Sequence, residues 1–266
     1  MKSYWRLAAG QTQKEYQRRC SMFRKLLFDL KEGFLDILYP PDLSCILCGE
    51  EAFIVPGYSL CRPCFDQLPF IRSSVCGVCG RPMDKGEICP DCSVQDHHFH
   101  QACSVFEYSP EIQKLIYRFK YGGQTYLAPF LGRCMAEKLE SMENRPSIQG
   151  LVPVPLHPNR RRKRGFNQAE LMAREMEKRT GIPVLDRVLI RKRDTSAQAG
   201  LRRLERMENM ANAFAFRNRE EIQSKILLLI DDIYTTGATA EQCSRVLMEA
   251  GASRVYVMTA ATVRIT

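Results

Sequence analysis

A short acidic segment is the first place where residue types and spacing suggest chemistry. In KILLLIDDIYTTGATAEQ, residues 225–242, an apolar run leads directly into Asp231 and Asp232 and then into a loop of small residues. Carboxylate oxygens accept hydrogen bonds and suit the hydroxyls of a sugar. Backbone N–H groups at the start of a helix, with threonine hydroxyls beside them, suit a phosphate. The loop consists of Thr235, Thr236, Gly237, Ala238 and Thr239. The segment indicates a phosphorylated-sugar site; a two-carboxylate metal site and an accidental acidic strand end are the alternatives.

Two common nucleotide-binding motifs do not occur in the sequence. The chain contains neither GxxxxGK[ST] nor GxGxxG. The first motif marks a P-loop and the second marks a dinucleotide-binding turn. A P-loop NTPase and a Rossmann-type dinucleotide enzyme are therefore unsupported.

Eight of the twelve cysteines form four C-x-x-C pairs, separated by 12, 11 and 9 residues. Two such pairs can surround one zinc ion tetrahedrally. The sequence predicts two structural zinc sites, with disulfides or an iron–sulfur cluster as alternatives. The ligands are Cys45, Cys48, Cys61, Cys64, Cys76, Cys79, Cys89 and Cys92. Gly49 and Gly80 follow second cysteines, where the backbone turns sharply around a metal. The sequence leaves open which pairs combine.

Three histidines, His97, His98 and His100, follow the last cysteine pair. Four cysteines already satisfy each zinc ion. We therefore assign these histidines no role from the sequence.

The chain carries a net charge of +9, partly in the runs RRRKR at 160–164 and RKR at 191–193. Such runs favour anionic partners, although a solvated charged face is an equally good explanation. No stretch approaches the ~20 apolar residues of a membrane-spanning helix, and the first residues lack the apolar core of a signal peptide. We expect a cytoplasmic protein.

The hydrophobic pattern predicts an α/β protein with a parallel sheet flanked by helices. Strands are expected near 102–108, 150–154, 184–191, 225–230 and 254–259, and helices near 110–121, 128–142, 167–180, 201–213 and 238–250. Another apolar stripe, from Phe23 to Leu38, predicts an amphipathic helix that ends before Pro40. The expected domains are an N-terminal extension over 1–40, a double zinc-ribbon domain over 41–95 and the α/β domain over 101–266.

Several parts of the chain carry a resemblance to known families. LLLIDDIYTTGAT resembles the phosphoribosyl pyrophosphate (PRPP) signature of type I phosphoribosyltransferases. Three other parts of the chain resemble the ComF competence proteins: the cysteine module, LVPVPLHPNRRRKRGFNQAELMA and RDTSAQAGLRRLERMENMANAF. The resemblance implies a type I phosphoribosyltransferase-like fold, in which Asp231 and Asp232 bind the ribose and Thr235–Thr239 bind the 5-phosphate. It also implies Mg²⁺ bound with PRPP and a pyrophosphate loop made of Pro153, Val154, Pro155 and Leu156.

Four further side chains are candidates for ligand contact. Arg160 and Arg164 follow the expected pyrophosphate loop, and guanidinium groups bind phosphate well. Gln198 and Arg203 lie in a polar segment that resembles the mobile hood of the transferases; each is more simply an exposed residue.

The resemblance implies a PRPP-binding protein of the DNA-uptake machinery that helps to internalise single-stranded DNA. Its expected partners are PRPP or a related phosphoribosyl ligand, single-stranded DNA, a DNA-uptake helicase and a membrane DNA channel, which would place it at the inner face of the membrane. The alternative is an active phosphoribosyltransferase with an unidentified nucleophilic acceptor. Glutaminase activity is disfavoured because the only early cysteine, Cys20, lies in a polar, basic stretch. A sequence-specific DNA reader is weaker, since no basic helix of readable spacing follows the cysteine pairs.

Overall fold

The computed structural model describes residues 44–142, 146–193 and 213–265. The chain divides into two compact units, and the boundary along the sequence falls between Cys64 and Phe65. The second group of four cysteines therefore lies in the same unit as the sheet. The expected domain boundaries, 41–95 and 101–266, remain predictions. The predicted helix from Phe23 to Leu38, the predicted helix over 201–213, Cys20, Gln198 and Arg203 all lie outside the described residues.

The first unit contains a small antiparallel hairpin. Strand β1 (Ile54–Val55) pairs with β2 (Leu60–Cys61), and helix α2 (Arg62–Asp66) follows directly. Gly57 has φ +79° and Ser59 has φ +53°, so the connecting turn uses left-handed backbone that glycine adopts without strain. The hairpin places Cys61 close to the end of a rigid element.

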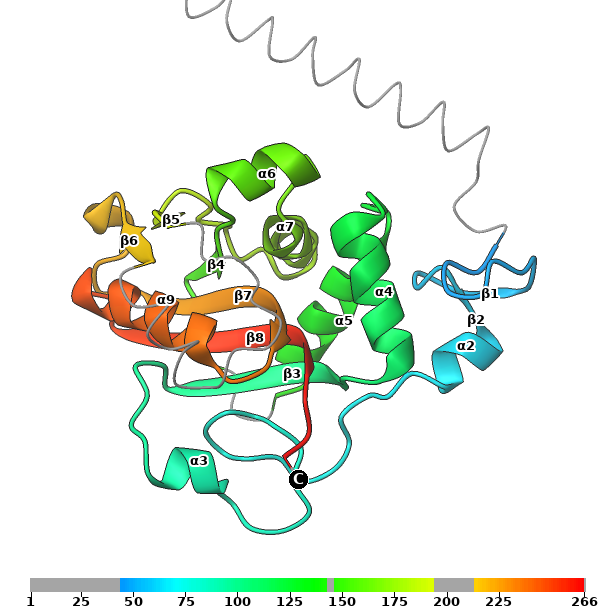
Figure 1. The fold of residues 1–266 in the computed structure, drawn as a ribbon, viewed down its shortest axis with the longest axis horizontal. Helices are drawn as coiled ribbons and strands as arrows, with labels where there is room; N and C mark the ends of the chain where they lie inside the picture. Colours follow the sequence, from blue (N-terminus) through cyan, green and yellow to red (C-terminus); the bar gives the residue numbers. More distant parts are fainter. Residues whose placement is uncertain (1–43, 143–145, 194–212, 266) are drawn as a thin grey trace, which may run out of the picture. The chain divides into compact units, whose positions relative to one another are not determined.

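The second unit is built on a four-stranded parallel sheet (Figure 1). The strands, in sheet order, are β3 (Gln101–Glu107), β8 (Arg254–Thr262), β7 (Ile226–Tyr234) and β4 (Gly150–Pro153). All three pairings are parallel, and β4 is buried along its whole length. Such nearly continuous apolar strands are typical of parallel sheets that helices cover on both faces. The predicted α/β class with a helix-flanked parallel sheet is confirmed.

Among the described residues, the longer helices of this unit are α4 (Pro110–Tyr121), α5 (Leu127–Glu140), α6 (Pro158–Arg164), α7 (Gln168–Thr180) and α9 (Ala238–Glu249). In the strand order β3-β8-β7-β4, the connection from β3 to β4 runs towards the β4 edge of the sheet. The connection from β7 to β8 runs in the opposite direction, towards the β3 edge. Since such crossovers are right-handed, α4 and α5 cover one face and α9 covers the opposite face. Helix α7 packs on α5. The shorter elements are α3 (Pro90–Ser93) and a 3₁₀ turn, Arg219–Glu221.

The structure differs from the sequence prediction in the lengths of three strands, of which β8 continues to Thr262, three residues beyond its expected end at 259. Strand β7 continues four residues beyond the expected Ile230, because β8 pairs with it as far as Tyr234. The expected strand over 184–191 is only β5 (Leu189–Arg191), which pairs antiparallel with β6 (Phe214–Phe216). A turn at Asp186 and Arg187 separates β5 from an isolated bridge between Val184 and Leu151.

Helix α6 was not predicted, because its basic run has no apolar stripe. Its signals lie at its ends. The ring of His157 accepts a hydrogen bond from the backbone N–H of Asn159, Pro158 occupies the first turn, and Gly165 ends the helix with φ +86°. These are ordinary start and stop signals for a helix.

Among the described residues, no helix has the length and apolar character needed to cross a membrane.

Candidate functional site

The candidate site lies where two neighbouring parallel strands part. Strand β4 pairs with β7 only as far as Pro153 and Ile230, and the last contact on this side is the hydrogen bond from the Val154 N–H to the Ile230 carbonyl, 2.9 Å. Strand β7 goes on for four residues against β8 alone. The residues that follow on β7 are Asp231 and Asp232, so their side chains lie at the carboxyl edge where parallel sheets bind ligands.

Helix α4 contributes a cation to this acidic pair. The Lys120 ammonium lies 2.7 Å from Asp232 Oδ1, and the two side chains are only 20% and 15% exposed. A carboxylate oxygen of Asp231 accepts a hydrogen bond from the Asp232 backbone N–H at 2.8 Å. Sequence reasoning missed Lys120, since it lies 112 residues from Asp232 and no motif surrounds it.

Burial and the two neighbouring charges set the protonation of this group. Desolvation raises the pKa of Asp231 to about 7, and the Asp232 charge adds to the rise, while Lys120 opposes it. Burial alone would lower the pKa of Lys120, but the charge and hydrogen bond of Asp232 raise it above the usual range. Lys120 is therefore a permanent cation, whereas Asp231 titrates near neutral pH.

The raised pKa of Asp231 predicts a pH-dependent effect of Asp231→Asn on stability. A folded-state pKa of about 7 against an ordinary value of 3.8 favours the folded state at low pH, and this contribution is lost as the pH rises through about 7. Asparagine does not titrate. The melting temperature of the variant minus that of the wild type should thus increase by several degrees between about pH 4 and pH 7.5. A difference that stays constant over this range would contradict the prediction.

Lys120→Met is expected to lower the free energy of unfolding by about 2 kcal/mol at pH 8, because it leaves the largely buried Asp232 carboxylate without this partner. The measurement is urea-induced unfolding. Lys178→Met is the matched control: Lys178 also pairs with a carboxylate, Glu175, at 2.8 Å, but it is 71% exposed. An exposed pair contributes ~0.5 kcal/mol or less. Equal losses in the two variants would show that Lys120 has no special role.

The loop of small residues connects β7 to α9 as the sequence predicts. Gly237 has φ +78° and immediately precedes the first helical residue, Ala238. A Cβ atom at Gly237 would lie 2.3 Å from the Tyr234 hydroxyl oxygen, which is too close for two non-bonded atoms. Glycine is therefore required here for two reasons: it leaves room for the Tyr234 side chain, and it adopts the positive φ angle without strain. The Thr236 hydroxyl accepts a long hydrogen bond, 3.5 Å, from the Ala238 N–H. Thr235–Thr239 therefore surround the N-terminus of α9, which favours anions.

The predicted pyrophosphate loop, Pro153 to Leu156, begins at the last residue of β4, and its Val154 N–H donates to the Ile230 carbonyl of β7. Its Val154 carbonyl accepts a hydrogen bond from the buried Asn167 side chain at 3.0 Å, and Asn167 also caps helix α7. The loop is thus fixed to the start of that helix. The role of the loop residues in binding a ligand remains a prediction.

Helix α6 holds the two predicted phosphate contacts, Arg160 and Arg164. The Arg164 guanidinium donates to Gln168 Oε1 at 2.7 Å and lies 5.0 Å from the ring centre of Tyr121 on α4. Its charge also reaches Lys120 and disfavours the charged form of that lysine. Arg164 is therefore close to Lys120, the partner of Asp232, whereas Arg160 is partly exposed one helical turn earlier.

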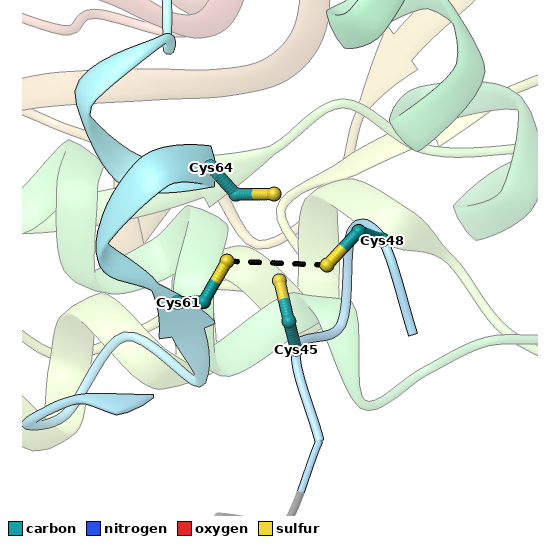
Figure 2. A group of neighbouring side chains, drawn as sticks. All are labelled: Cys45, Cys48, Cys61 and Cys64. Carbon is teal, nitrogen blue, oxygen red and sulfur yellow. Dashed lines mark hydrogen bonds between the residues drawn. The ribbon is translucent and has the colours of Figure 1, made fainter. Parts of the chain in front are cut away.

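The first group of cysteines forms a compact cluster in the first unit (Figure 2). The sulfur atoms of Cys45, Cys48, Cys61 and Cys64 all lie within 4.8 Å of one another. Four sulfurs at about 2.3 Å from a zinc ion would be about 3.8 Å apart. The Cys48 and Cys61 sulfurs are separated by 3.9 Å, so the cluster fits zinc.

The second group of cysteines forms a matching cluster in the second unit. The sulfurs of Cys76, Cys79, Cys89 and Cys92 lie within 4.8 Å of one another, with 3.8 Å between Cys79 and Cys89. The pairs therefore combine in sequential order, which the sequence left open. Gly49 and Gly80 have φ +82° and +67°, as expected for metal knuckles. Both clusters confirm the predicted zinc sites, and each is closed by four thiolates, so the metal is structural.

Arg81 balances the charge of the second cluster. Four thiolates around Zn²⁺ leave a net charge of −2. The Arg81 side chain donates to Cys79 Sγ at 3.4 Å and to Cys89 Sγ at 3.7 Å, and it pairs with Asp91 at 2.6 Å. Three of the four ligands, Cys76, Cys79 and Cys89, are buried in the core that includes β7, β8 and α9.

Two histidines that the sequence left without a role connect this cluster to α9. His97 Nε2 lies 3.4 Å from Cys92 Sγ, and its other ring nitrogen lies 3.0 Å from Glu241 Oε2. The Glu241 carboxylate also contacts the ring of His98 and accepts from its backbone N–H at 3.3 Å. Although burial raises the pKa of Glu241, the histidine contacts lower it overall, so the carboxylate is charged. Glu241 lies in the first turn of α9, directly after the candidate phosphate loop.

Comparison with known proteins gives a consistent result. The double zinc ribbon domain family matches residues 34–93. The chain is 28% identical over 221 residues to "Competence protein F" of Haemophilus influenzae, covering 81% of this chain and 95% of that protein. It is 28% identical to "DNA utilization protein YhgH" of Escherichia coli K12, with 76% and 96% covered. It is 25% identical to "Competence protein ComFC" of Bacillus subtilis, with 79% and 90% covered.

Similar solved structures include the glutamine PRPP amidotransferase of B. subtilis, with a TM-score of 0.33, 22% identity, and 48% of this chain but only 24% of that chain covered. They also include adenine phosphoribosyltransferase from Leishmania tarentolae, with a TM-score of 0.32, 12% identity, and 59% and 76% covered. This chain therefore spans about a quarter of the amidotransferase's length. The curated relatives, in contrast, are matched over nearly their whole length, so the chain is similar, across most of its sequence, to the competence proteins F and ComFC and to the DNA utilization protein YhgH.

Proposed function

We propose that this protein binds PRPP, with Mg²⁺, at the edge of its sheet and handles single-stranded DNA during DNA uptake. One observation supports the ligand: β4 and β7 stop pairing after Pro153 and Ile230. Asp231 and Asp232 therefore lie on β7 between this point and the N-terminus of α9. The acids suit ribose hydroxyls, and the helix terminus suits the 5-phosphate. The names of the relatives support the DNA role.

The charges at the site support a ligand with both a polyol part and an anionic part. Asp231 and Asp232 supply acceptors, while Lys120 and Arg164 supply cations within the same small region. A pyrophosphate group would be attracted to these cations, whereas a neutral sugar would not need them. Mg²⁺ prefers carboxylate and phosphate oxygens and commonly accompanies substrate phosphates, so it fits the same pair of partners.

Isothermal titration calorimetry of zinc-replete protein tests the proposal. Mg²⁺ and PRPP are expected to bind saturably and more tightly than ribose 5-phosphate or pyrophosphate alone, because each of these lacks one of the two recognised parts. A single-stranded oligonucleotide is titrated separately. Equal affinities for PRPP and pyrophosphate would mean that the acidic pair does not recognise the ribose, and the proposal for the ligand would fail.

The second candidate function is an active phosphoribosyltransferase. It is favoured by Lys120 and Arg164, since cations near a leaving pyrophosphate stabilise the charge that develops as the bond to the anomeric carbon breaks. The nucleophilic acceptor is not identified by the described residues. Release of pyrophosphate from PRPP in the presence of candidate acceptors, including ammonia, is the measurement, and the Asp231→Asn/Asp232→Asn variant is its control.

A further inference from the structure

The outer face of helix α4 carries aromatic rings where a solvent-facing helix usually has polar residues. The opposite face is an ordinary core stripe, formed by the buried Ile112, Leu115, Ile116 and Phe119. On the outer face, however, Tyr117 is 63% exposed and Tyr121 is 62% exposed. Neither ring is needed for the core, so the face has a feature that the fold does not explain.

The two rings form a pair that other groups hold in place. Tyr117 and Tyr121 are one helical turn apart, with ring centres 5.0 Å apart and planes inclined at 45°. The Arg164 guanidinium lies 5.0 Å from the centre of the Tyr121 ring. Arg118, between them in sequence, donates to the Tyr126 hydroxyl at 3.1 Å and to Gln124 Oε1 at 2.7 Å.

The surroundings of the pair are basic. Lys114, an exposed residue one turn before Tyr117, continues the same stripe, which we call the tyrosine face: Lys114, Tyr117, Arg118 and Tyr121. The sequence from Lys114 to Tyr126 contains no acidic residue, and neither does helix α6. The basic tyrosine face should therefore bind a negatively charged polymer in preference to a partner protein whose surface has few acidic residues.

An unpaired nucleic acid strand combines the two features that this face offers. Every base has a π face that stacks on an aromatic side chain, and each nucleotide carries a phosphate that pairs with Lys or Arg. A phosphorylated small molecule would use the cations but leave an exposed tyrosine pair without function. A duplex would use the cations only, because its bases already stack on one another.

We propose that the tyrosine face binds single-stranded DNA, with bases stacked on Tyr117 and Tyr121 and phosphates beside Lys114 and Arg118. The inference rests on the DNA-handling part of the proposed function and is independent of PRPP binding. It places the strand on α4, whose last turn also supplies Lys120 to the acidic pair. The strand would thus lie next to the candidate ligand site.

Fluorescence anisotropy with a labelled oligothymidylate of about 20 nucleotides and the full chain tests this inference. The Tyr117→Ala/Tyr121→Ala variant is expected to bind at least about tenfold more weakly, and the Tyr117→Phe/Tyr121→Phe variant within about twofold of the wild type, since phenylalanine also stacks. Phe53→Ala, which removes an 85% exposed aromatic ring elsewhere, should leave the affinity unchanged. Lys114→Gln should reduce the salt dependence of binding by about 0.7 in logarithmic slope.

Three outcomes would overturn the inference. They are unchanged oligonucleotide affinity in the double alanine variant, no measurable binding by the wild type, and an equal loss of affinity for a duplex of the same length. Calorimetry with Mg²⁺ and PRPP on the same preparations shows whether the variants are folded. The single variant Tyr117→Ala separates the two proposals, because it leaves the contact of Arg164 with Tyr121 in place and should weaken oligonucleotide binding without changing PRPP binding.

Discussion

Replacing Asp231 and Asp232 together by asparagine is expected to weaken Mg²⁺-dependent PRPP binding by at least about 100-fold. In the proposed site, each carboxylate would accept a charge-assisted hydrogen bond from a ribose hydroxyl at pH 8, above the pKa of about 7 of Asp231, and such bonds contribute ~1.5–3 kcal/mol each. Asparagine keeps the shape but loses the charge. Calorimetric titration with PRPP measures the effect.

The control for this variant must change the same number of charges. Glu50 and Glu51 are also adjacent acids, but both are exposed and lie in the first unit. Glu50→Gln/Glu51→Gln should therefore bind PRPP as the wild type does. The Asp variant loses the repulsion between the two carboxylates but also leaves Lys120 without its charged partner, so urea-induced unfolding must show that it is folded. If it bound PRPP with wild-type affinity, the acidic pair would not be the ribose site.

The sequence alone was sufficient for the parts of the fold that depend on local patterns. The apolar run before Asp231 predicts a buried strand, the small residues after it predict a helix start, and the C-x-x-C spacing predicts the two metal clusters. In each case a few neighbouring residues determine the outcome. The strand ends were less certain, because the length of β7 is set by its pairing with β8 and not by its own residues.

The residues that the sequence did not identify act through contacts between distant segments. Lys120 and Asp232 are 112 positions apart, and His97 and Glu241 are 144 positions apart. A lysine at the end of a helix and a glutamate in the first turn of another have ordinary local explanations, as ends of helices favour these charges. Only the packing of α4 and α9 against the strand ends reveals their partners.

The contact of His97 with both Cys92 and Glu241 suggests that the second zinc site also supports the ligand site. The zinc cluster fixes residues 76–92, His97 and His98 hold Glu241, and Glu241 lies in the first turn of α9. The same turn follows the loop that we propose for the 5-phosphate. A structural metal stabilises a domain by holding its ligands in the folded state. Here that stabilisation would reach the loop as well.

Cys89→Ser is therefore expected to remove one of the two zinc ions, to lower the free energy of unfolding by at least about 3 kcal/mol and to weaken PRPP binding about tenfold or more. Cys89 is fully buried, and its cluster is part of the core around β7 and α9. Loss of the metal leaves three thiol groups and Arg81 in a site built for a charged cluster. Zinc content, urea-induced unfolding and calorimetric titration measure the three effects.

Cys48→Ser is the matched control, since it is the same chemical change in the other cluster. Cys48 is exposed and its cluster lies in the first unit, so this variant should also lose one zinc ion but keep wild-type PRPP affinity. Glu241→Gln distinguishes the contact through His97 from general unfolding: it should retain both zinc ions and still weaken PRPP binding, because a neutral amide holds the two histidines less strongly. If Cys89→Ser and Cys48→Ser affected PRPP binding equally, the second zinc site would have no particular connection to the phosphate loop.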